Sequence, residues 1–420
     1  MNNGGMNNIA PTITPLAAMA AVADAAVLIC LIGTQGATLA WDDDNVETCP
    51  ITSDVPIDFT PRDHQDPFFE PTCGQTWGNV PPSATFIQLD YEFPTITPRV
   101  LKPRHIVQWD SLGNCRILTD DSATAEQTKA RLQRNPILLP KVQFATPLRG
   151  RWSESEYTGR VNQIREWIAA GDCYQANLAM PFTATLQAGP QRDVSLFAQL
   201  VTGSAAPFSG FFRSPRRPSI VSHSPECFIA QRGKRIVSVP IKGTRRRIHG
   251  REDEIRADLI NAPKDHAELA MIVDLVRNDL GRVAIPGSVQ VVDRGHLIDL
   301  SHVHHRAARI EATLAQGQHL RHVVAAAFPA GSITGAPKLR AMQILRKLEN
   351  SPRGAYCGTF GWMNAHSADL AVAIRTASIT NDQLTFHAGG GIVWDSEARA
   401  EWDEVHAKAA GFAHAIGAWS

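Results

Sequence analysis

The sequence predicts an α+β fold, and three observations carry this prediction. Apolar strand-like runs occur at 219–230, 235–241 and 369–379, and segments with helical periodicity lie near 251–261, 265–280, 337–349 and 397–416. These strands and helices come partly in runs instead of alternating strictly, which favours α+β over repeated βαβ units. With 420 residues, 44% of them hydrophobic, the chain can bury a sizeable core.

The N-terminal run PLAAMAAVADAAVLICLIGT (15–34) is the first element along the chain. It has no basic residues before it and Asp24 interrupts it, so it predicts a buried helix, or a helix plus a strand, and not a signal peptide. A strand follows at 84–93. Turn residues at 140–152 mark a boundary between an N-terminal region, residues 1–140, and a domain at 150–413.

A helix over 154–170 is the next predicted element. Ser153 and Glu156 form a capping box, and Tyr157, Val161, Ile164 and Ile168 recur at helical spacing. Gly171 follows where a C-terminal cap belongs.

Charge and cysteine usage exclude several classes of protein. Lysine plus arginine number 41 and aspartate plus glutamate number 41, so no global field attracts nucleic acid or an anionic membrane. The seven cysteines contain no C-x-x-C pair, which argues against a disulfide framework or a thiolate zinc site and favours a cytoplasmic location.

The stretch VPIKGTRRR (239–247) places Lys242 at the end of an apolar strand, with Arg245, Arg246 and Arg247 behind it. Partial desolvation and nearby cations both favour the neutral amine, which can attack carbon. The alternative is a strand-end lysine whose ammonium group reaches water.

Acidic residues on two predicted helices form a candidate metal site. Glu268 lies in the first turn of the helix at 265–280, while Glu401, Glu404 and Lys408 share one face of the helix at 397–416. Magnesium needs only one or two carboxylates besides water and substrate oxygens. Alternatively, acidic residues in a first helical turn simply favour the helix dipole.

Two glycine-rich segments are candidate ligand contacts. In FPAGSITGAPKLRAMQIL (328–345) a loop leads into a helix predicted to begin at Pro337, where free N–H groups suit a carboxylate or serve an ordinary helix start. In AGGGIVWDS (388–396) the glycines indicate a bulge or close approach of a ligand. Arg375, inside an alternating strand, either pairs with a buried carboxylate or binds an anionic substrate.

Together these pieces resemble the chorismate-utilising enzymes. The resemblance covers residues 150–413 through seven ordered motifs: SPECF (224–228), PIKGTRRR (240–247), DHAELAMIVDLVRNDLGRV (265–283), GSITGAPKLRAM (331–342), RGAYCGTFGW (353–362), AIRTA (373–377) and GGGIVWDSEARAEWDE (389–404). It implies a single large unit of two mostly antiparallel sheets packed face to face with helices outside, to which residues 1–140 also contribute.

The resemblance also implies roles for individual residues. Lys242 is expected to be the nucleophile, Glu226 the general acid and His305 a histidine that faces the substrate ring. The expected magnesium ligands are Glu268, Glu401 and Glu404. The expected substrate contacts are Gly243, Thr244, Thr334, Gly335, Tyr356, Arg375, Gly389, Gly390, Gly391 and Lys408.

The expected reaction is the amination of chorismate to 4-amino-4-deoxychorismate for 4-aminobenzoate and folate. Relatives that make anthranilate usually have alanine where this chain has Lys242, and relatives that add water carry a lysine where this chain has Gln175. Ammonia is expected from a separate glutamine amidotransferase subunit, because no cysteine lies in a G-x-C-x-G motif. The alternatives are an anthranilate synthase component I and a catalytically silent metabolite-binding subunit.

Overall fold

The computed structural model describes residues 14–418 except 34–35, 44–76, 78–79, 82, 94, 111, 113, 120, 135–137, 203–205 and 301–302. The Pro-rich stretch before residue 82 therefore lies almost wholly outside the described residues. No described helix is long and apolar enough to cross a membrane.

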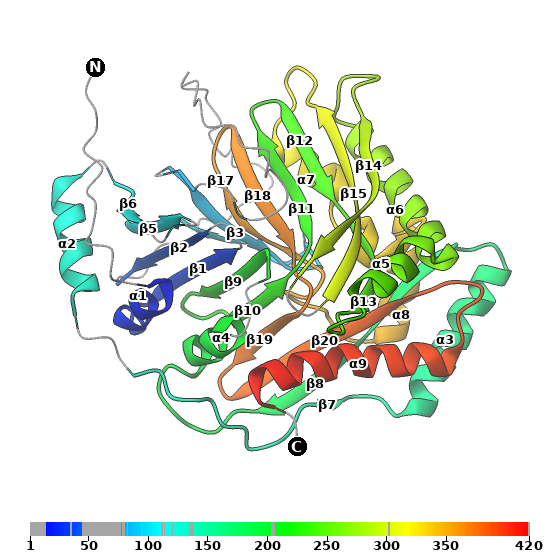
Figure 1. Ribbon diagram of the computed structural model, residues 1–420, viewed down its shortest axis with the longest axis horizontal. Coiled ribbons are helices and arrows are strands. Elements are labelled where there is room, and N and C mark those ends of the chain that lie inside the picture. The colour runs from blue at the N-terminus through cyan, green and yellow to red at the C-terminus, as the bar shows by residue number, and fades with distance from the viewer. Residues whose placement is uncertain are drawn as a thin grey trace.

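Two large sheets form the body of the protein (Figure 1). The first has the strand order β16 (Gly335–Ala336), β8 (Gln175–Thr185), β20 (Gln383–Ile392), β19 (Thr376–Thr380), β10 (Ser219–Ser224), β9 (Phe208–Arg213), β1 (Val27–Gly33), β2 (Gly36–Asp42), β5 (His105–Asp110) and β6 (Cys115–Ile117), with β7 (Arg149–Gly150) also paired to β8. The second has the order β13 (Ile241–Arg246), β15 (Val303–Thr313), β12 (Arg235–Val239), β11 (Cys227–Arg232), β18 (Ser367–Val372), β17 (Thr359–Met363), β3 (Thr85–Leu89) and β4 (Arg99–Leu101), with β14 (Gln290–Asp299) on β15. The pairings shown for these strands are antiparallel, which confirms the predicted fold class.

Helices cover the outer faces of both sheets (Figure 1). The first sheet contacts α1 (Pro15–Ala21), α2 (Ser122–Leu132), α3 (Glu154–Ala169), α4 (Arg192–Thr202), α8 (Lys338–Glu349) and α9 (Ala398–Ile416). On the second sheet lie α5 (Glu252–Asn261) and α6 (Pro263–Gly281), with α7 (Leu320–Ala327) against α6. A short 3-10 turn, η1 (Gly331–Ile333), precedes β16.

The interior between the sheets is filled by large apolar side chains from both. Phe212 of the first sheet and Phe360 and Trp362 of the second are fully buried there. A Cβ on Gly210 would lie 2.4 Å from the Phe360 ring, so only glycine permits this close packing. Further apolar clusters lie between each sheet and its helices.

The N-terminal third adds strands to both sheets. Strands β1, β2, β5 and β6 extend the first sheet, whereas β3 and β4 extend the second. The run at 15–34 forms helix α1 followed by strand β1, as predicted. The five described cysteines are all buried, while Cys49 and Cys73 lie outside the described residues.

Most predicted helices are confirmed. The Ser153–Glu156 capping box is present at the start of α3, and Gly171 has the left-handed conformation that a C-terminal cap requires. The predicted start at Pro337 is wrong by one residue, because Pro337 is the N-cap of α8 and Lys338 begins the helix.

Two predicted strands are each divided between the sheets. The run at 219–230 consists of β10 in the first sheet and β11 in the second, and the run at 369–379 consists of β18 in the second and β19 in the first. Apolar periodicity continues through each crossing because both halves are buried, so the sequence pattern does not reveal the change of sheet.

Candidate active site

The two crossings between the sheets lie side by side and position Glu226 and Arg375. The Ser224 hydroxyl donates to the Val372 carbonyl at 2.6 Å, and the Val372 N–H donates to the Glu226 carbonyl at 3.0 Å. The His223 N–H donates to the Arg375 carbonyl at 3.0 Å. These bonds hold both functional groups at the junction of the two sheets.

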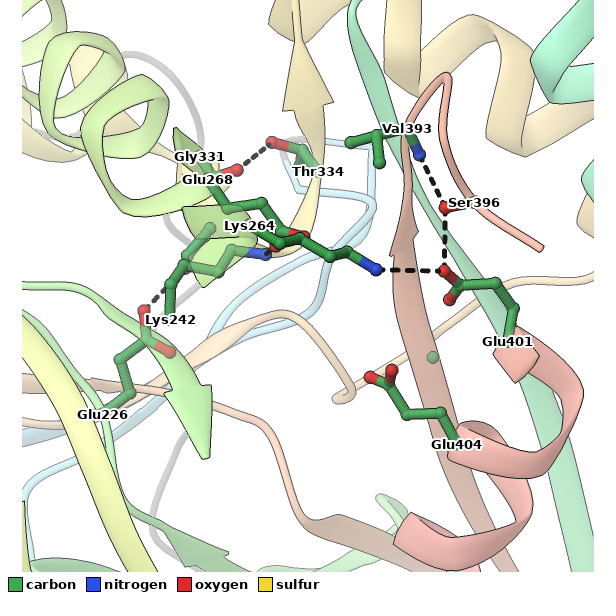
Figure 2. A network of polar contacts seen from close by, with 12 residues as sticks. Glu226, Lys242, Lys264, Glu268, Gly331, Thr334, Val393, Ser396, Glu401 and Glu404 are labelled. Carbon is green, nitrogen blue, oxygen red and sulfur yellow. Dashed lines mark hydrogen bonds and ion pairs between the residues drawn. The ribbon is translucent and has the colours of Figure 1, made fainter. Parts of the chain in front are cut away.

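Lys242 extends from β13 across this junction. Its Nζ lies 3.6 Å from Glu268 Oε2 on α6, and both side chains are largely buried (Figure 2). A Cβ built on Gly391 of β20 would lie 3.5 Å from the same Nζ and 2.4 Å from Gln175 Nε2. The lysine therefore bridges the second sheet to the glycine segment of the first.

Glu226 is the buried carboxyl group beside this lysine (Figure 2). Burial raises the pKa of Glu226 to about 7, although the Ser332 hydroxyl, the Lys242 charge and the Ile241 N–H all oppose the rise. Ser332 Oγ donates to Glu226 Oε1 at 2.6 Å. A carboxyl group with this pKa can hold a proton near neutral pH and release it to a leaving group.

Thr244 and His305 are joined by a hydrogen bond of 2.8 Å between Oγ1 and Nδ1. Burial, together with the charge of Arg375, lowers the pKa of His305 to about 3, so the ring is neutral. Its buried Nε2 has no hydrogen-bond partner among the described residues. A neutral ring with one unused nitrogen can accept from or donate to a bound ligand without adding charge.

The carboxylates of Glu401 and Glu404 converge on β20. A Cβ on Gly390 would lie 2.9 Å from Glu401 Oε2 and 3.8 Å from Glu404 Oε1. Burial and the Glu404 charge raise the pKa of Glu401. The pKa of Glu404 is lowered. Burial alone would raise the pKa of Glu404, but the charge of Lys408, with smaller contributions from other lysines, outweighs burial.

Two lysines and one serine contact the carboxylate oxygens of these two glutamates. Lys264 Nζ lies 3.8 Å from Glu401 Oε1, to which Ser396 Oγ donates at 2.8 Å (Figure 2). Lys408 Nζ donates to Glu404 Oε1 at 2.6 Å and to the Gly389 carbonyl at 2.8 Å.

Of the three predicted magnesium ligands, only Glu401 and Glu404 are arranged as a hard cation requires. Two converging carboxylates are what magnesium uses when water and substrate oxygens complete its shell. Glu268 points instead at Lys242, and the described residues contain no group of three or more acidic, histidine or cysteine side chains placed to hold a metal. The three predicted ligands thus border the same space without forming a closed cage.

The structure also describes the surroundings of four other residues that were predicted to contact the substrate. Gly243 and Gly335 have positive φ, and a Cβ on Gly335 would lie 2.2 Å from the Gln175 carbonyl, so glycine is required where β16 meets β8. Thr334 is buried and donates to the Ala330 carbonyl at 3.0 Å. Tyr356 stacks on His387 with ring centroids 5.3 Å apart, and no described contact joins it to Lys242.

Sequence reasoning missed three residues of this region. Ser332 binds Glu226, and Ser396 and Lys264 bind Glu401. Ser332 and Ser396 lie inside the quoted motifs, and Lys264 lies one residue before the motif at 265–283, but nothing in their spacing shows which carboxylate each one reaches.

Comparison with known proteins shows which family the chain belongs to. The sequence profile of the family described as chorismate binding enzyme matches residues 70–414. The chain belongs to the chorismate binding enzyme family. This confirms the resemblance found in the sequence motifs.

Two curated members of the chorismate binding family illustrate the similarity. Aminodeoxychorismate synthase component 1 of Klebsiella aerogenes is 43% identical over 263 residues, which is 62% of this chain and 57% of that protein. Anthranilate synthase component 1 of Geobacillus stearothermophilus is 40% identical over 270 residues, which is 63% of this chain and 52% of that protein. The matched part thus spans only a little over half of each relative.

Solved structures of similar proteins agree on the fold. Anthranilate synthase component I from Streptococcus pneumoniae superposes with a TM-score of 0.70 at 25% identity, covering 81% of this chain and 82% of that one. The menaquinone-specific isochorismate synthase from Escherichia coli superposes with a TM-score of 0.77 at 16% identity, covering 96% of this chain and 91% of that one. The second likeness establishes the fold alone.

Proposed function

We propose that this chorismate binding enzyme is an aminodeoxychorismate synthase, which converts chorismate and ammonia into 4-amino-4-deoxychorismate for 4-aminobenzoate and folate synthesis. The observation that carries the proposal is the Lys242 amine, held between the Glu268 carboxylate and the glycine segment of β20, beside a carboxyl group whose pKa is raised to about 7. The 43% identity to an aminodeoxychorismate synthase component 1 supports it.

The reaction takes place in two displacements. In the first, the nitrogen of Lys242 bonds to C2 of the ring after losing a proton from its ammonium form, the ring double bonds shift, and the C4–O bond breaks. Glu226 supplies the proton with which the hydroxyl leaves as water, and the lysine nitrogen gives up a proton in turn. In the second, ammonia bonds to C4 and gives up a proton, the double bonds shift back, and the C2–N bond breaks as the lysine nitrogen takes up a proton, so Lys242 is regenerated. Dividing the substitution in this way gives each step an easier barrier.

Magnesium, held by Glu401 and Glu404 with Glu268 beside them, would anchor the ring carboxylate of chorismate by its charge. The residues of the chain itself then orient the substrate. Arg375 offers a buried guanidinium to a carboxylate, while the neutral His305 faces the ring without competing for that anion.

A separate glutamine amidotransferase subunit is the proposed source of ammonia. The name component 1 of the relatives supports a two-component enzyme. Cys173, in GDCYQ, is buried and its pKa is raised by burial, so it lacks the thiolate character of an amidotransferase nucleophile.

Product identification tests the proposal. The full chain is incubated with chorismate, magnesium and ammonium salt, and the products are separated by chromatography. We expect 4-amino-4-deoxychorismate; fluorescent anthranilate with no added lyase would instead support an anthranilate synthase component I. Chorismate left unchanged by folded protein would support a catalytically silent subunit.

Substitution of the lysine tests the covalent step. Lys242→Ala is expected to abolish C4 amination, whereas the matched control Lys234→Ala, at an exposed hairpin, is expected to keep the wild-type rate. Mass spectrometry of acid-quenched wild-type protein is expected to find a substrate adduct on the peptide that contains Lys242. A wild-type amination rate in Lys242→Ala would refute the nucleophile.

A further inference from the structure

A cavity of about 510 Å³ lies beside strands β10 and β19, at the end of this strand pair that is farther from the candidate active site. It is lined by Gly189, Gln191, Arg192, Asp193, Arg213, Arg216, Arg217, Pro218, Ser219, Ile379, Thr380 and Asn381. Ser219 pairs with Ile379 where β10 begins and β19 ends, whereas Glu226 follows the other end of β10. At about 3.3 Å per residue, the seven-residue separation from Ser219 to Glu226 spans roughly 20 Å. The cavity is therefore distinct from the active site.

The lining is strongly cationic. It contains four arginines and one aspartate, an excess of three formal positive charges, although the whole chain has a formal net charge of zero. Asp193 is already engaged, because Arg213 Nε donates to it at 2.8 Å and Ser219 Oγ at 2.6 Å. The charge of Asp193 thus neutralises that of one arginine, and the charges of the other three arginines are not neutralised within the lining.

The other three arginines have no carboxylate partner among the described residues. Arg192 donates to the Gln187 and Asn381 carbonyls, and Arg217 donates to the Thr97 carbonyl at 2.7 Å. Arg216 is exposed and makes no described hydrogen bond or ion pair. Backbone carbonyls orient a guanidinium group but do not neutralise it, so this cavity keeps a positive field directed at its interior.

The backbone adds to the same field. Helix α4 begins at Arg192, so the positive end of its dipole lies at the cavity, although the Val194 N–H already donates to Asp193 Oδ1 at 2.9 Å. Three turns meet around the cavity, and each contains a residue with positive φ: Gln191, Arg216 and Asn381. Such left-handed residues are uncommon outside glycine, and their concentration here indicates turns that are shaped to form this hollow.

We propose that this cavity is a binding site for a small molecule that carries a phosphate group. Planar guanidinium groups bind phosphate oxygens in pairs, and several arginines around a helix N-terminus match a doubly charged group better than a single carboxylate. The volume lies within the range of sites for small metabolites. Because the site is roughly 20 Å from the catalytic residues, its ligand binds apart from the substrate of the proposed reaction.

Calorimetric titration of the full chain with pyrophosphate tests the proposal, with inorganic phosphate and succinate as parallel probes. We expect saturable binding of one pyrophosphate, and weaker binding of succinate. The double variant Arg216→Gln/Arg217→Gln is expected to weaken pyrophosphate binding at least about tenfold, since each charged hydrogen bond to an anion contributes a factor of about ten.

Arg346→Gln, an exposed arginine of α8 with no described partner, is the matched control and is expected to bind as the wild type does. Arg213 is left intact, because it also holds the Ala23 carbonyl and Asp193 and its loss would disturb the fold. Equal affinity in the double variant, or the absence of saturable binding in the wild type, would overturn the proposal. Succinate binding as tightly as pyrophosphate would overturn the preference for phosphate.

Discussion

Removing the hydroxyl of Ser332 tests how the pKa of Glu226 is set. Ser332 and Glu226 are both buried, and the Ser332 Oγ to Glu226 Oε1 distance is 2.6 Å. In Ser332→Ala this donor is lost and nothing replaces it in the buried space. The ionised form of Glu226 is then destabilised while the protonated form is little affected, so the pKa must rise above its present value of about 7.

The size of the rise follows from the strength of the hydrogen bond. A hydrogen bond to a charged group contributes about 1.5–3 kcal/mol, and one pKa unit corresponds to about 1.4 kcal/mol, so the pKa of Glu226 should rise by about 1 to 2 units. In the proposed mechanism Glu226 acts in its protonated form, so activity should fall as pH rises through its pKa. In Ser332→Ala that fall should move to higher pH by the same 1 to 2 units.

Two measurements check this shift. The pH dependence of kcat/KM for chorismate follows the free enzyme, and an infrared titration of the carboxylic-acid C=O stretch, assigned by its loss in Glu226→Gln, follows the group directly. Ser351→Ala, whose hydroxyl lies near a backbone carbonyl, serves as the control and should leave both profiles in place. A shift to lower pH, or no shift, in Ser332→Ala would refute the assignment of Ser332 as the group that holds this pKa down.

Two further predictions concern the glycine segment and the core. Gly391→Ala should slow chorismate amination at least about tenfold, because its Cβ would lie 2.4 Å from Gln175 Nε2. The control Gly159→Ala, on helix α3, should keep the wild-type rate, because a Cβ there would meet no neighbouring segment within 4 Å. Equal rates in the two variants would contradict this interpretation of β20. Arg353→Leu should lower the free energy of unfolding by about 3–5 kcal/mol in chemical denaturation. The Glu349 carboxylate, which Arg353 now binds at 2.6 and 2.8 Å, would stay buried without its cationic partner. Removing both charges together should restore much of the lost free energy of unfolding.

Much of the secondary structure could be predicted from the sequence. The capping box before α3 and helices α5, α6 and α9 follow from spacing alone, because each depends on neighbours within a few residues. For the N-terminal run the sequence left a buried helix or a helix plus a strand open, and the structure has the second. The roles expected for the site residues come from the family resemblance of the motifs, because each motif taken alone also has a purely structural interpretation.

What each site residue touches was decided by tertiary structure. Glu226 meets Ser332 across 106 positions of sequence, and His305 meets Thr244 across 61, distances over which no periodicity carries information. The split of two apolar runs between sheets likewise depends on long-range pairing.

The sequence by itself determined the fold class and the chemical groups available, because periodicity, capping and residue type are local properties. Only the tertiary structure decided which carboxyl group is buried beside the lysine and which is paired with a cation, because burial and charge proximity belong to the packed sheets as a whole. For the same reason the arginine-lined cavity has no sequence motif: its residues come from three separate segments that meet only where β9, β10, β19 and α4 come together.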